Sequence, residues 1–318
     1  MRYGFLGPET TFTHQALLQA LVELPAERSA EAELVPFTSV ATATNALVDG
    51  EIDAIMAPIE NSVEGGVSGT LDVLAAHKRI TIVAEQIVPI TFVLAAKEPS
   101  ALSAIREVAS HTHAQAQVQR WLRENLPSAA ILPASSTAGA AQALAEAEPE
   151  EARGRAAICS PLAAEHFGLA VLARGIEDNV GAQTRFVLVT RNDRIPARTG
   201  ADKTTLVVQL PADRPGSLLE MLETFKVNGV NLSRIESRPL GDALGRYSFS
   251  IDIEGHLEDR RVASALRGLH RSCAVTYLGS YPRADGQRTQ IDPVMADGAY
   301  DAGNEWVQSL SRMIAPQS

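Results

Sequence analysis

The stretch Arg2-Tyr3-Gly4-Phe5-Leu6 opens the chain as a short apolar strand, and the loop Gly7-Pro8-Glu9-Thr10-Thr11 follows it directly. The residues after the loop repeat apolar side chains at helical spacing, at Ala16, Leu17, Ala20 and Leu21. A strand, a polar loop and a helix in this order form the first half of a βαβ unit. We therefore expect the chain to begin with an α/β sheet.

The same alternation continues over the next 140 or so residues, as is typical of a mostly parallel α/β sheet system. The predicted strands are Leu34–Phe37, Asp53–Pro58, Ile80–Glu85, Ile90–Ala95, a segment near Ile131, and Ala156–Cys159. The predicted helices are Thr13–Leu24, a helix capped by Ser39 that runs towards Gly50, Ala114–Glu124, and Thr137–Ala147.

The pattern changes after the polar segment 191–203, which we interpret as a linker. A β-α-β-β-α-β order follows, which is the order of ferredoxin-like domains. Its strands are Thr204–Leu210, Asn231–Ser237, Tyr247–Ile253 and Ala274–Ser280, and its helices are Ser217–Val227 and Glu258–His270. In the polar tail, Trp306, Leu310 and Met313 share one helical face, which we expect to dock on the body or on a neighbouring subunit.

The composition is that of an ordinary globular protein, with 318 residues of which 45% are hydrophobic and 21% are charged. This length allows two domains of about 150 residues each. The formal net charge of −10 argues against a protein that binds a phosphate backbone, because such proteins carry a basic surface. It leaves room for a small anionic substrate, so we expect a small-molecule partner and no nucleic acid.

Cys159 and Cys273 have no second Cys or His at the spacing of a metal site, so we expect both to pack as small apolar side chains and no metal to bind. The sequence shows no signal segment and no apolar run long enough to span a bilayer. We therefore expect a cytoplasmic protein without membrane contact.

Two polar clusters follow predicted strands of the first region. Gly7–Thr13 starts a helix, where amides and threonine hydroxyls can bind a carboxylate, although an ordinary capped helix start has the same pattern. Pro58–Asp72 leaves the carboxyl end of a buried strand, where α/β proteins place ligands, and carries Glu60, Asn61 and Ser62. A structural loop explains this second cluster equally well.

Two further clusters precede a helix and a strand. Ser110–Gln117 contains two histidines, but residues two apart do not share a helix face, so a helix cap explains the cluster better than a metal site. Asn179–Phe186 places Thr184 and Arg185 before a strand, where a guanidinium group can bind a carboxylate through two hydrogen bonds. An arginine at a strand edge is also common without any such role.

Together the four clusters resemble the ordered signature of the prephenate dehydratase family. The matching motifs are Gly7-Pro8-Glu9 with Thr11-Phe12, Pro58-Ile59-Glu60-Asn61-Ser62 with Thr70-Leu71-Asp72, Ser110-His111, and Thr184-Arg185-Phe186. In the C-terminal region, Gly216-Ser217-Leu218-Leu219 resembles the Gly-Ala-Leu-Val motif of the family's ACT domain, and Glu236-Ser237-Arg238-Pro239 matches its Glu-Ser-Arg-Pro motif. The resemblance extends from Arg2 to about Pro282.

The resemblance implies an α/β two-lobed catalytic region, similar to type II periplasmic binding proteins, over residues 1–190. It also implies a ferredoxin-like α+β ACT regulatory domain over 204–282, after the linker 191–203 and before a tail with a short helix over 283–318. We expect Arg2–Asp72 and Ala156–Val189 to form one lobe, and Ile80–Ala147 the other. The substrate is expected in the cleft between the lobes.

The implied activity is that of a hydro-lyase, which converts prephenate into phenylpyruvate, carbon dioxide and water in phenylalanine biosynthesis. Because the ring becomes aromatic as carbon dioxide and hydroxide leave, no cofactor is needed, and the sequence has no dinucleotide fingerprint or P-loop. The family assigns Thr184 a hydrogen bond to the departing hydroxyl, and a buried Glu60 is our candidate proton donor. We expect Arg185 and the amides around Thr11 to hold carboxylates.

The remaining predicted site residues follow from the same motifs. Asn61 and Ser62 are expected to orient the ring, and the resemblance also places Phe12, Ser110, His111 and Phe186 at the substrate. The sequence departs from the family pattern at four nearby positions. Thr10 stands where glycine is usual, Thr112 and His113 replace Pro-Gln, and Ala182 replaces asparagine.

The ACT domain implies feedback regulation by L-phenylalanine and a homodimer or homotetramer. The predicted effector site comprises Asp213, Gly216, Ser217, Leu218, Leu219, Asn231, Glu236 and Ser237. Amides at the start of a helix can hold the carboxylate of an amino acid, and Asn231 or Glu236 can bind its ammonium group. Alternatively, Glu236 and Arg238 pair with each other on the sheet surface.

Two other functions are compatible with the sequence. An arogenate dehydratase performs the same chemistry on the aminated substrate. A non-catalytic sensor of an amino acid or an aromatic acid needs the same two ligand-binding folds but no turnover.

Overall fold

The computed structural model describes residues 1–23, 31–63, 65–191, 194–212, 214–239 and 247–314. The chain divides into two compact units. The first contains Met1–Val73 and Gln86–Arg191, and the second contains Leu74–Glu85 and Asn192–Ser318. Residues 74–85 lie in the predicted catalytic region but group with the C-terminal domain, which the sequence pattern did not indicate.

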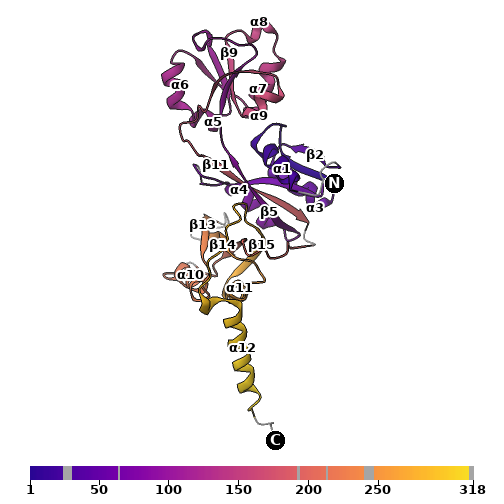
Figure 1. Ribbon diagram of the computed structural model, residues 1–318, viewed down its shortest axis with the longest axis vertical. Helices are drawn as coiled ribbons and strands as arrows, with labels where there is room; N and C mark the ends of the chain where they lie inside the picture. Colours follow the sequence, from indigo (N-terminus) through magenta and orange to yellow (C-terminus); the bar gives the residue numbers. More distant parts are fainter. Residues whose placement is uncertain (24–30, 64, 192–193, 213, 240–246, 315–318) are drawn as a thin grey trace. The chain divides into compact units, whose positions relative to one another are not determined.

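The first sheet has the strand order β2-β1-β3-β11-β5, with β4 paired to β3. Its strands are β1 Arg2–Leu6, β2 Glu33–Phe37, β3 Ala54–Asn61, β4 Gly65–Gly66, β5 Ile80–Pro89 and β11 Gln183–Arg191, and its helices are α1 Phe12–Val22, α3 Val40–Asp49 and α4 Ser68–Ala76 (Figure 1). β1 pairs in parallel with β2 and β3, whereas β11 returns antiparallel to β3. Ser39 caps α3 as predicted, because its hydroxyl accepts the Thr42 amide in a capping box.

The second sheet has the order β10-β6-β9-β7-β8. Its strands are β6 Val93–Ala96, β7 Glu107–Ser110, β8 Ala130–Pro133, β9 Arg155–Cys159 and β10 Ala170–Arg174. Its helices are η1 Leu102–Ala104, α5 Thr112–Ala116, α6 Gln119–Asn125, α7 Thr137–Glu146, α8 Pro149–Ala152 and α9 Pro161–His166. One apolar core joins Leu94, Val108 and Leu122, and another joins Ala141, Cys159 and Leu169. Two α/β lobes of this kind confirm the predicted fold class of the catalytic region.

The distribution of strands between the lobes corrects the sequence prediction. Ile80–Pro89 belongs to the first sheet and Arg155–Cys159 to the second, the reverse of the predicted assignment. The chain crosses between sheets after β5 and again before β11, and a buried apolar strand has the same local pattern in either sheet. The helix predicted over 114–124 is two helices, because the backbone leaves the helical region at Val118 (φ −127°).

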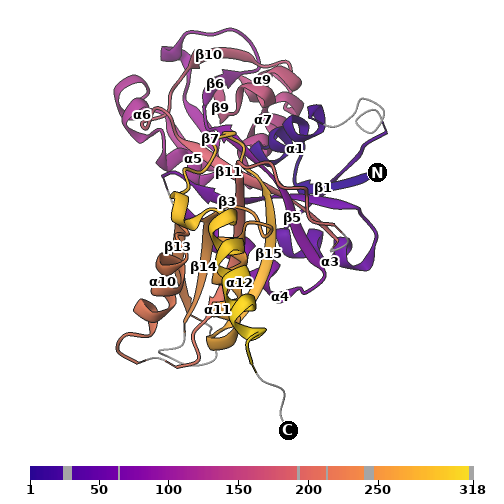
Figure 2. The ribbon, with the colours of Figure 1, turned by 60° about the horizontal axis from the view of Figure 1, so that its bottom comes forward.

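The C-terminal sheet has the order β13-β14-β12-β15, with every pair antiparallel, which confirms the ferredoxin-like prediction. Its elements are β12 Asp202–Gln209, α10 Ser217–Val227, β13 Leu232–Pro239, β14 Tyr247–Glu254, α11 Arg260–Ser272 and β15 Ala274–Pro282. Leu206, Phe225 and Leu269 belong to one apolar core that the sheet shares with α10 and α11. Figure 2 shows these two helices beside the sheet. β12 begins at Asp202, two residues inside the predicted linker.

The tail forms η2 Pro293–Met295 and α12 Asp297–Ser311. Ion pairs fix the start of α12, since Arg198 contacts Asp297 at 2.7 Å and Arg260 contacts Asp301 at 3.0 Å. Further along, Trp306, Leu310 and Met313 are 64%, 45% and 79% exposed. The structure of one chain therefore does not dock this apolar face on the body, and the neighbouring-subunit alternative stays a prediction.

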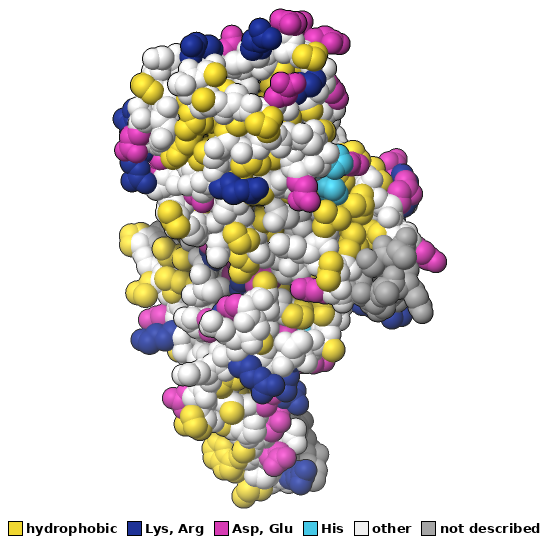
Figure 3. All heavy atoms as spheres, turned by 45° about the horizontal axis from the view of Figure 1, so that its top comes forward, with side chains coloured by type: hydrophobic (Ala, Val, Ile, Leu, Met, Phe, Trp, Pro, Cys, Tyr) yellow, Lys and Arg dark blue, Asp and Glu magenta, His cyan; other side chains and the backbone are white. Residues whose placement is uncertain are grey.

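Four further observations concern membrane spans, metal-binding groups, surface charge and cysteines of the described residues. None of their helices is long and apolar enough to cross a membrane, and they contain no group of three or more His, Cys, Asp or Glu able to hold a metal ion. On the face shown in Figure 3, acidic and basic side chains are interspersed. Cys159 is buried in an apolar core, whereas Cys273 is half-buried, and both are thiols.

Candidate active site

A cavity of about 430 Å³ lies between the two lobes of the first unit. Six of the ten residues predicted at the catalytic and substrate site line it: Thr11, Phe12, Asn61, His111, Thr184 and Phe186. The other lining residues are Leu6, Gly7, Thr13, Thr38, Pro58, Val67, Ile90, Phe92, His113, Ala114, Gln117, Ser135, Ser136 and Thr137. Motifs more than 120 residues apart in the chain therefore meet at one site.

Asn61 and Thr184 form the polar centre of this cleft. They are register partners on β3 and β11, and Asn61 Nδ2 donates a hydrogen bond to Thr184 Oγ1 at 2.9 Å. The Val63 amide donates to Asn61 Oδ1 at 2.8 Å, which fixes the orientation of the Asn61 amide. Because Thr184 Oγ1 accepts from Asn61, its own hydrogen is left to donate to a ligand.

Arg185 and Glu60 are the next register pair and do not line the cleft. Arg185 Nε donates to Glu60 Oε2 at 3.0 Å, and the Arg185 side chain is only 7% exposed. Successive side chains of a strand point to opposite faces, so Thr184 and Phe186 reach the cavity while Arg185 faces away. The structure does not bring the Glu60 carboxylate to Thr184 as a proton donor, and Arg185 is engaged in an ion pair.

Ser62 and Ser110 also lie outside the cavity lining. Ser62 Oγ accepts the Gln183 amide at 2.9 Å, which ties the end of β3 to the start of β11. Ser110 is fully buried, and its hydroxyl donates to the Ile158 carbonyl at 2.7 Å. In these contacts both hydroxyls support the strands that position the site.

Two helix N-termini open into the cleft. Thr11 caps α1 by accepting the His14 amide at 3.3 Å, and its hydroxyl donates to the Leu6 carbonyl at 2.9 Å. Ser136 caps α7 by accepting the Gly139 amide at 2.8 Å. The first N–H groups of a helix have no partner within the helix, and the helix dipole adds partial positive charge there. These two ends therefore make the cleft suitable for carboxylates.

An aromatic and aliphatic wall completes the cavity. Phe12 and Phe92 meet edge to face with ring centroids 5.8 Å apart, and Ile90 and Phe186 are 5% and 2% exposed. Such a wall accommodates a carbocyclic ring between the polar centre and the helix ends.

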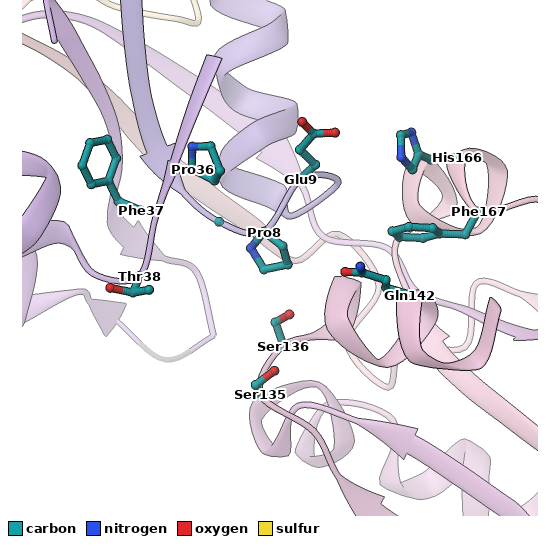
Figure 4. A pocket seen from close by; sticks show the side chains of 11 residues that line it. Pro8, Glu9, Pro36, Phe37, Thr38, Ser135, Ser136, Gln142, His166 and Phe167 are labelled. Atoms are coloured by element: carbon teal, nitrogen blue, oxygen red, sulfur yellow. The ribbon is translucent and has the colours of Figure 1, made fainter. Parts of the chain in front are cut away.

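A wider cavity of about 730 Å³ adjoins the first and shares Gly7, Thr38, Ser135 and Ser136 with it. Figure 4 shows Glu9, from the loop after β1, and His166, from the end of α9, on facing sides of this outer cavity. Gln142 and Phe167 extend its wall on the second lobe. The outer cavity is the part of the cleft that carries an acidic side chain.

Sequence reasoning missed several lining residues. Ser135-Ser136-Thr137 starts α7 and Thr38 precedes α3, so the same helix-start signal that identified Thr11 was present at both places. His113 and Gln117 belong to the cluster Ser110–Gln117, but the sequence pattern alone does not distinguish them as site residues. Ile90 and Phe92 were interpreted as strand core because apolar residues give no signal for a site.

The predicted effector residues that the structure describes lie on α10 and β13 or directly before them. Gly216 precedes α10 with φ +91°, and Ser217 Oγ donates to the Ala212 carbonyl at 3.1 Å. Glu236 contacts Arg234 at 3.4 Å. Leu218, Leu219, Asn231 and Ser237 are exposed, and Asp213 lies outside the described residues. The geometry does not assign a ligand to them.

Known proteins similar to the chain agree on one family. A family model described as prephenate dehydratase matches residues 3–194, and one described as ACT domain matches residues 204–271. A prephenate dehydratase of Amycolatopsis methanolica is 40% identical over 313 residues, covering 98% of each protein.

Two solved structures are similar over most of the chain. The structure of a prephenate dehydratase from Arthrobacter aurescens in complex with L-Phe is 50% identical, covers 98% of this chain and 100% of that one, and has a TM-score of 0.88. GqqA, described as a novel type of quorum quenching acylase, is 28% identical to this chain and has a TM-score of 0.76. The similarity covers 89% of this chain and 98% of GqqA. The family match over residues 3–194 and the identity to the Amycolatopsis protein settle the assignment: this chain belongs to the prephenate dehydratase family.

Proposed function

We propose that the chain is a prephenate dehydratase, a hydro-lyase that converts prephenate into phenylpyruvate, carbon dioxide and water and responds to L-phenylalanine. Family membership supports the activity. The observation that carries the assignment to this cleft is the Asn61–Thr184 hydrogen bond, since it places a fixed hydroxyl donor in the cleft between the lobes.

The reaction needs little from the protein besides binding and a hydrogen bond to the departing oxygen. Prephenate is a dianion, and loss of carbon dioxide and hydroxide leaves the phenylpyruvate monoanion. One proton is consumed because hydroxide departs as water. Aromatisation of the ring drives the bond cleavages, so the cleft must hold two carboxylates and stabilise the departing oxygen.

The helix ends support carboxylate binding by the cleft. Thr11 with Phe12 and Ser136 with Thr137 place the starts of α1 and α7 on its lining. Amides and dipoles at these positions favour anions without a buried counter-ion. Thr184 then donates a hydrogen bond to the leaving hydroxyl of prephenate, and Asn61 keeps the Thr184 oxygen in place.

The lining favours prephenate over arogenate. Arogenate carries an ammonium group where prephenate has a keto oxygen. Among the described residues that line the inner cavity there is no Asp or Glu, and Glu9 lies in the adjoining outer cavity, so an ammonium group held in the inner cavity would be desolvated without an acidic side chain on its lining. A keto group has no such requirement.

Four of the predicted residues, Glu60, Ser62, Ser110 and Arg185, support the site in this proposal without lining the cleft. The Glu60–Arg185 pair and the Ser62–Gln183 contact hold β3 and β11 in register, and Ser110 fixes β7 against β9. His111 lines the cleft at the start of α5, where it faces the substrate with Phe12 and Phe186.

We also propose the domain organisation predicted from the sequence, with a catalytic domain over 1–190, a linker over 191–203, an ACT domain over 204–282 and a tail. The ACT match over 204–271 supports a regulatory role for the second unit. The Arthrobacter relative was solved with L-Phe, which supports L-phenylalanine as the effector here. The effector residues, a homodimer or homotetramer, and a cytoplasmic location remain part of the proposal.

One titration tests activity and regulation together. Phenylpyruvate formation from prephenate is measured with the purified full chain at increasing L-phenylalanine, and in parallel with arogenate as substrate. We expect turnover of prephenate that falls as L-phenylalanine rises, with slower turnover of arogenate. Turnover without any response removes the regulatory proposal, and a folded protein inactive on both substrates leaves the sensor alternative.

A further inference from the structure

Thr10 has an unfavourable backbone conformation in the loop between β1 and α1. Its φ of +67° makes it the one non-glycine residue with positive φ among the described residues. β-branched side chains disfavour this left-handed region. The Thr10 hydroxyl is also buried without a hydrogen-bond partner. Local preference therefore does not explain the conformation of this loop, and contacts from elsewhere must hold it.

Two side chains supply those contacts. The Thr10 amide donates to His14 Nδ1 at 2.9 Å, and the Ser160 hydroxyl donates to the Thr10 carbonyl at 3.2 Å. The three residues are buried, with 2%, 9% and 1% exposure for Thr10, His14 and Ser160. His14 belongs to α1 of the first lobe and Ser160 caps α9 of the second. Both polar backbone atoms of Thr10 are thus held, one from each lobe.

The hydrogen bond from the Thr10 amide requires that His14 Nδ1 carry no proton. Its ring stacks on Phe5 with centroids 4.7 Å apart and planes 21° apart. Nδ1 accepts a hydrogen bond, so the proton of the neutral ring sits on Nε2. Burial lowers the pKa of His14, and the nearby Glu9 carboxylate opposes this while His166 adds to it.

The loop that contains Thr10 contributes residues to both cavities. The loop supplies Gly7 and Thr11 to the inner cavity, and Gly7, Pro8 and Glu9 to the outer one. We propose that His14 is a positioning residue of the dehydratase reaction: with Ser160 it holds Thr10 in the left-handed conformation and so fixes the loop that forms the carboxylate-binding start of α1. This inference rests on the proposed function.

Protonation of His14 should release the loop. An imidazolium group carries N–H at Nδ1, which would face the Thr10 amide hydrogen instead of accepting it. Glu9 and His166 are the titratable groups whose electrostatic interactions act on His14. Because the pKa of His14 is lowered, the neutral ring persists below the ordinary histidine range, and activity is lost only as pH falls further.

Three substitutions separate this role from simple packing. His14→Phe keeps an aromatic ring on Phe5 but removes the acceptor. His14→Asn keeps an acceptor near the position of Nδ1 but removes the stacked ring. Thr10→Gly removes the conformational penalty, because glycine adopts positive φ without strain. Each variant is compared with wild type in kcat/KM for prephenate across pH, in thermal unfolding, and in hydrogen exchange of the Thr10 amide.

We expect His14→Phe to lower kcat/KM roughly 10- to 100-fold, as small misplacements of a binding loop do, and to speed exchange of the Thr10 amide. His14→Asn should recover most of the loss and remove the acidic limb of the pH profile. The effect of His14→Phe should shrink at least several-fold in the Thr10→Gly background.

Two outcomes overturn the inference. One is a folded His14→Phe protein with the activity, pH profile and amide exchange of wild type. The other is an equal loss in His14→Phe and His14→Asn that Thr10→Gly does not relieve, which indicates packing alone. A wild-type protein that makes no phenylpyruvate contradicts the proposed function instead, and amide exchange still reports on the contact.

Discussion

Asn61 donates its amide hydrogen to the hydroxyl oxygen of Thr184 across the antiparallel pair β3 and β11, at 2.9 Å. The two residues are 123 positions apart in the chain, and only the crossing of the chain between lobes brings them together. The contact orders the hydroxyl so that its own hydrogen can donate into the cleft. Catalysis benefits because a donor that is already oriented needs no reorganisation during the reaction.

Asn61→Ala should therefore lower kcat for prephenate by roughly 10-fold or more, since one catalytic donor loses its support. KM should change less, because carboxylate binding at the helix ends is left intact. Asn61→Asp is the matched variant, and its added negative charge should also raise KM for the dianion. Steady-state kinetics on both variants check this, and an Asn61→Ala protein with wild-type kcat would contradict it.

The Arg185–Glu60 pair should behave as a structural unit. If Arg185 only orders the strands, Arg185→Gln and Glu60→Gln should each lower the free energy of unfolding by about 1 kcal/mol, and the double variant should lose less than the sum. A direct role at the substrate predicts something different, namely a large rise in KM for Arg185→Gln alone. Denaturant unfolding and kinetics on the three variants distinguish the two roles.

The arrangement of site residues shows how far the sequence could lead. The motifs identified Asn61, Thr184, His111 and the start of α1, because polar residues at strand ends and helix starts share a recognisable signal. The same motif Thr184-Arg185-Phe186 hid the fact that its middle residue points away from the cleft. Strand alternation could have revealed this, once the segment was extended from Val187 back to Gln183.

Local sequence patterns do not determine to which of the two lobes a strand belongs. Ile80–Pro89 and Arg155–Cys159 are buried apolar strands, and their neighbours depend on where the chain crosses between the sheets. Likewise, no sequence pattern indicates that the Ser110 hydroxyl donates to the Ile158 carbonyl, or that His14 accepts a hydrogen bond from the Thr10 amide. Such contacts depend on tertiary packing. The ferredoxin-like order was accessible because its six elements follow one another along the chain.

The buried ion pair of the second unit gives a prediction on stability. Lys203 Nζ donates to both oxygens of Glu85, at 3.1 and 2.9 Å, and the Glu85 side chain is only 2% exposed. Lys203→Met removes the hydrogen-bonded cation from a buried carboxylate, which keeps its contact with the Ala284 amide at 3.0 Å, and should cost about 3 kcal/mol. Glu85→Gln/Lys203→Met removes both charges and should recover much of that loss in thermal unfolding.

The same pair should affect regulation. Glu85 ends the part of β5 that groups with the second unit, and the strand continues into the sheet that contains β11. If the second unit regulates the cleft as proposed, a change at Glu85 should therefore weaken the effect of L-phenylalanine on turnover. We expect the doubly substituted protein to be less inhibited by L-phenylalanine at equal occupancy of its effector site, as measured by ligand binding alongside kinetics. Unchanged inhibition by L-phenylalanine would show that the Lys203–Glu85 pair and β5 do not take part in regulation.

The two cysteines should differ in reactivity. Burial raises the pKa of the Cys159 thiol to about 12, so the nucleophilic thiolate is nearly absent at pH 8. Cys273 is half-buried and should react first. In the Cys273→Ser variant, a disulfide exchange reagent should modify Cys159 very slowly in the native state and rapidly in denaturant. Fast native modification of that variant would mean that Cys159 is accessible.

The most direct test of the central claim compares wild type, Thr184→Val and Thr184→Ser in phenylpyruvate formation from prephenate. Valine keeps the shape of threonine but lacks the hydroxyl, whereas serine retains it. We predict that wild type makes phenylpyruvate, that Thr184→Val loses roughly 100-fold in kcat while remaining folded, and that Thr184→Ser keeps most of the activity. A folded Thr184→Val protein with near wild-type turnover would contradict the assignment of the reaction to the Asn61–Thr184 centre.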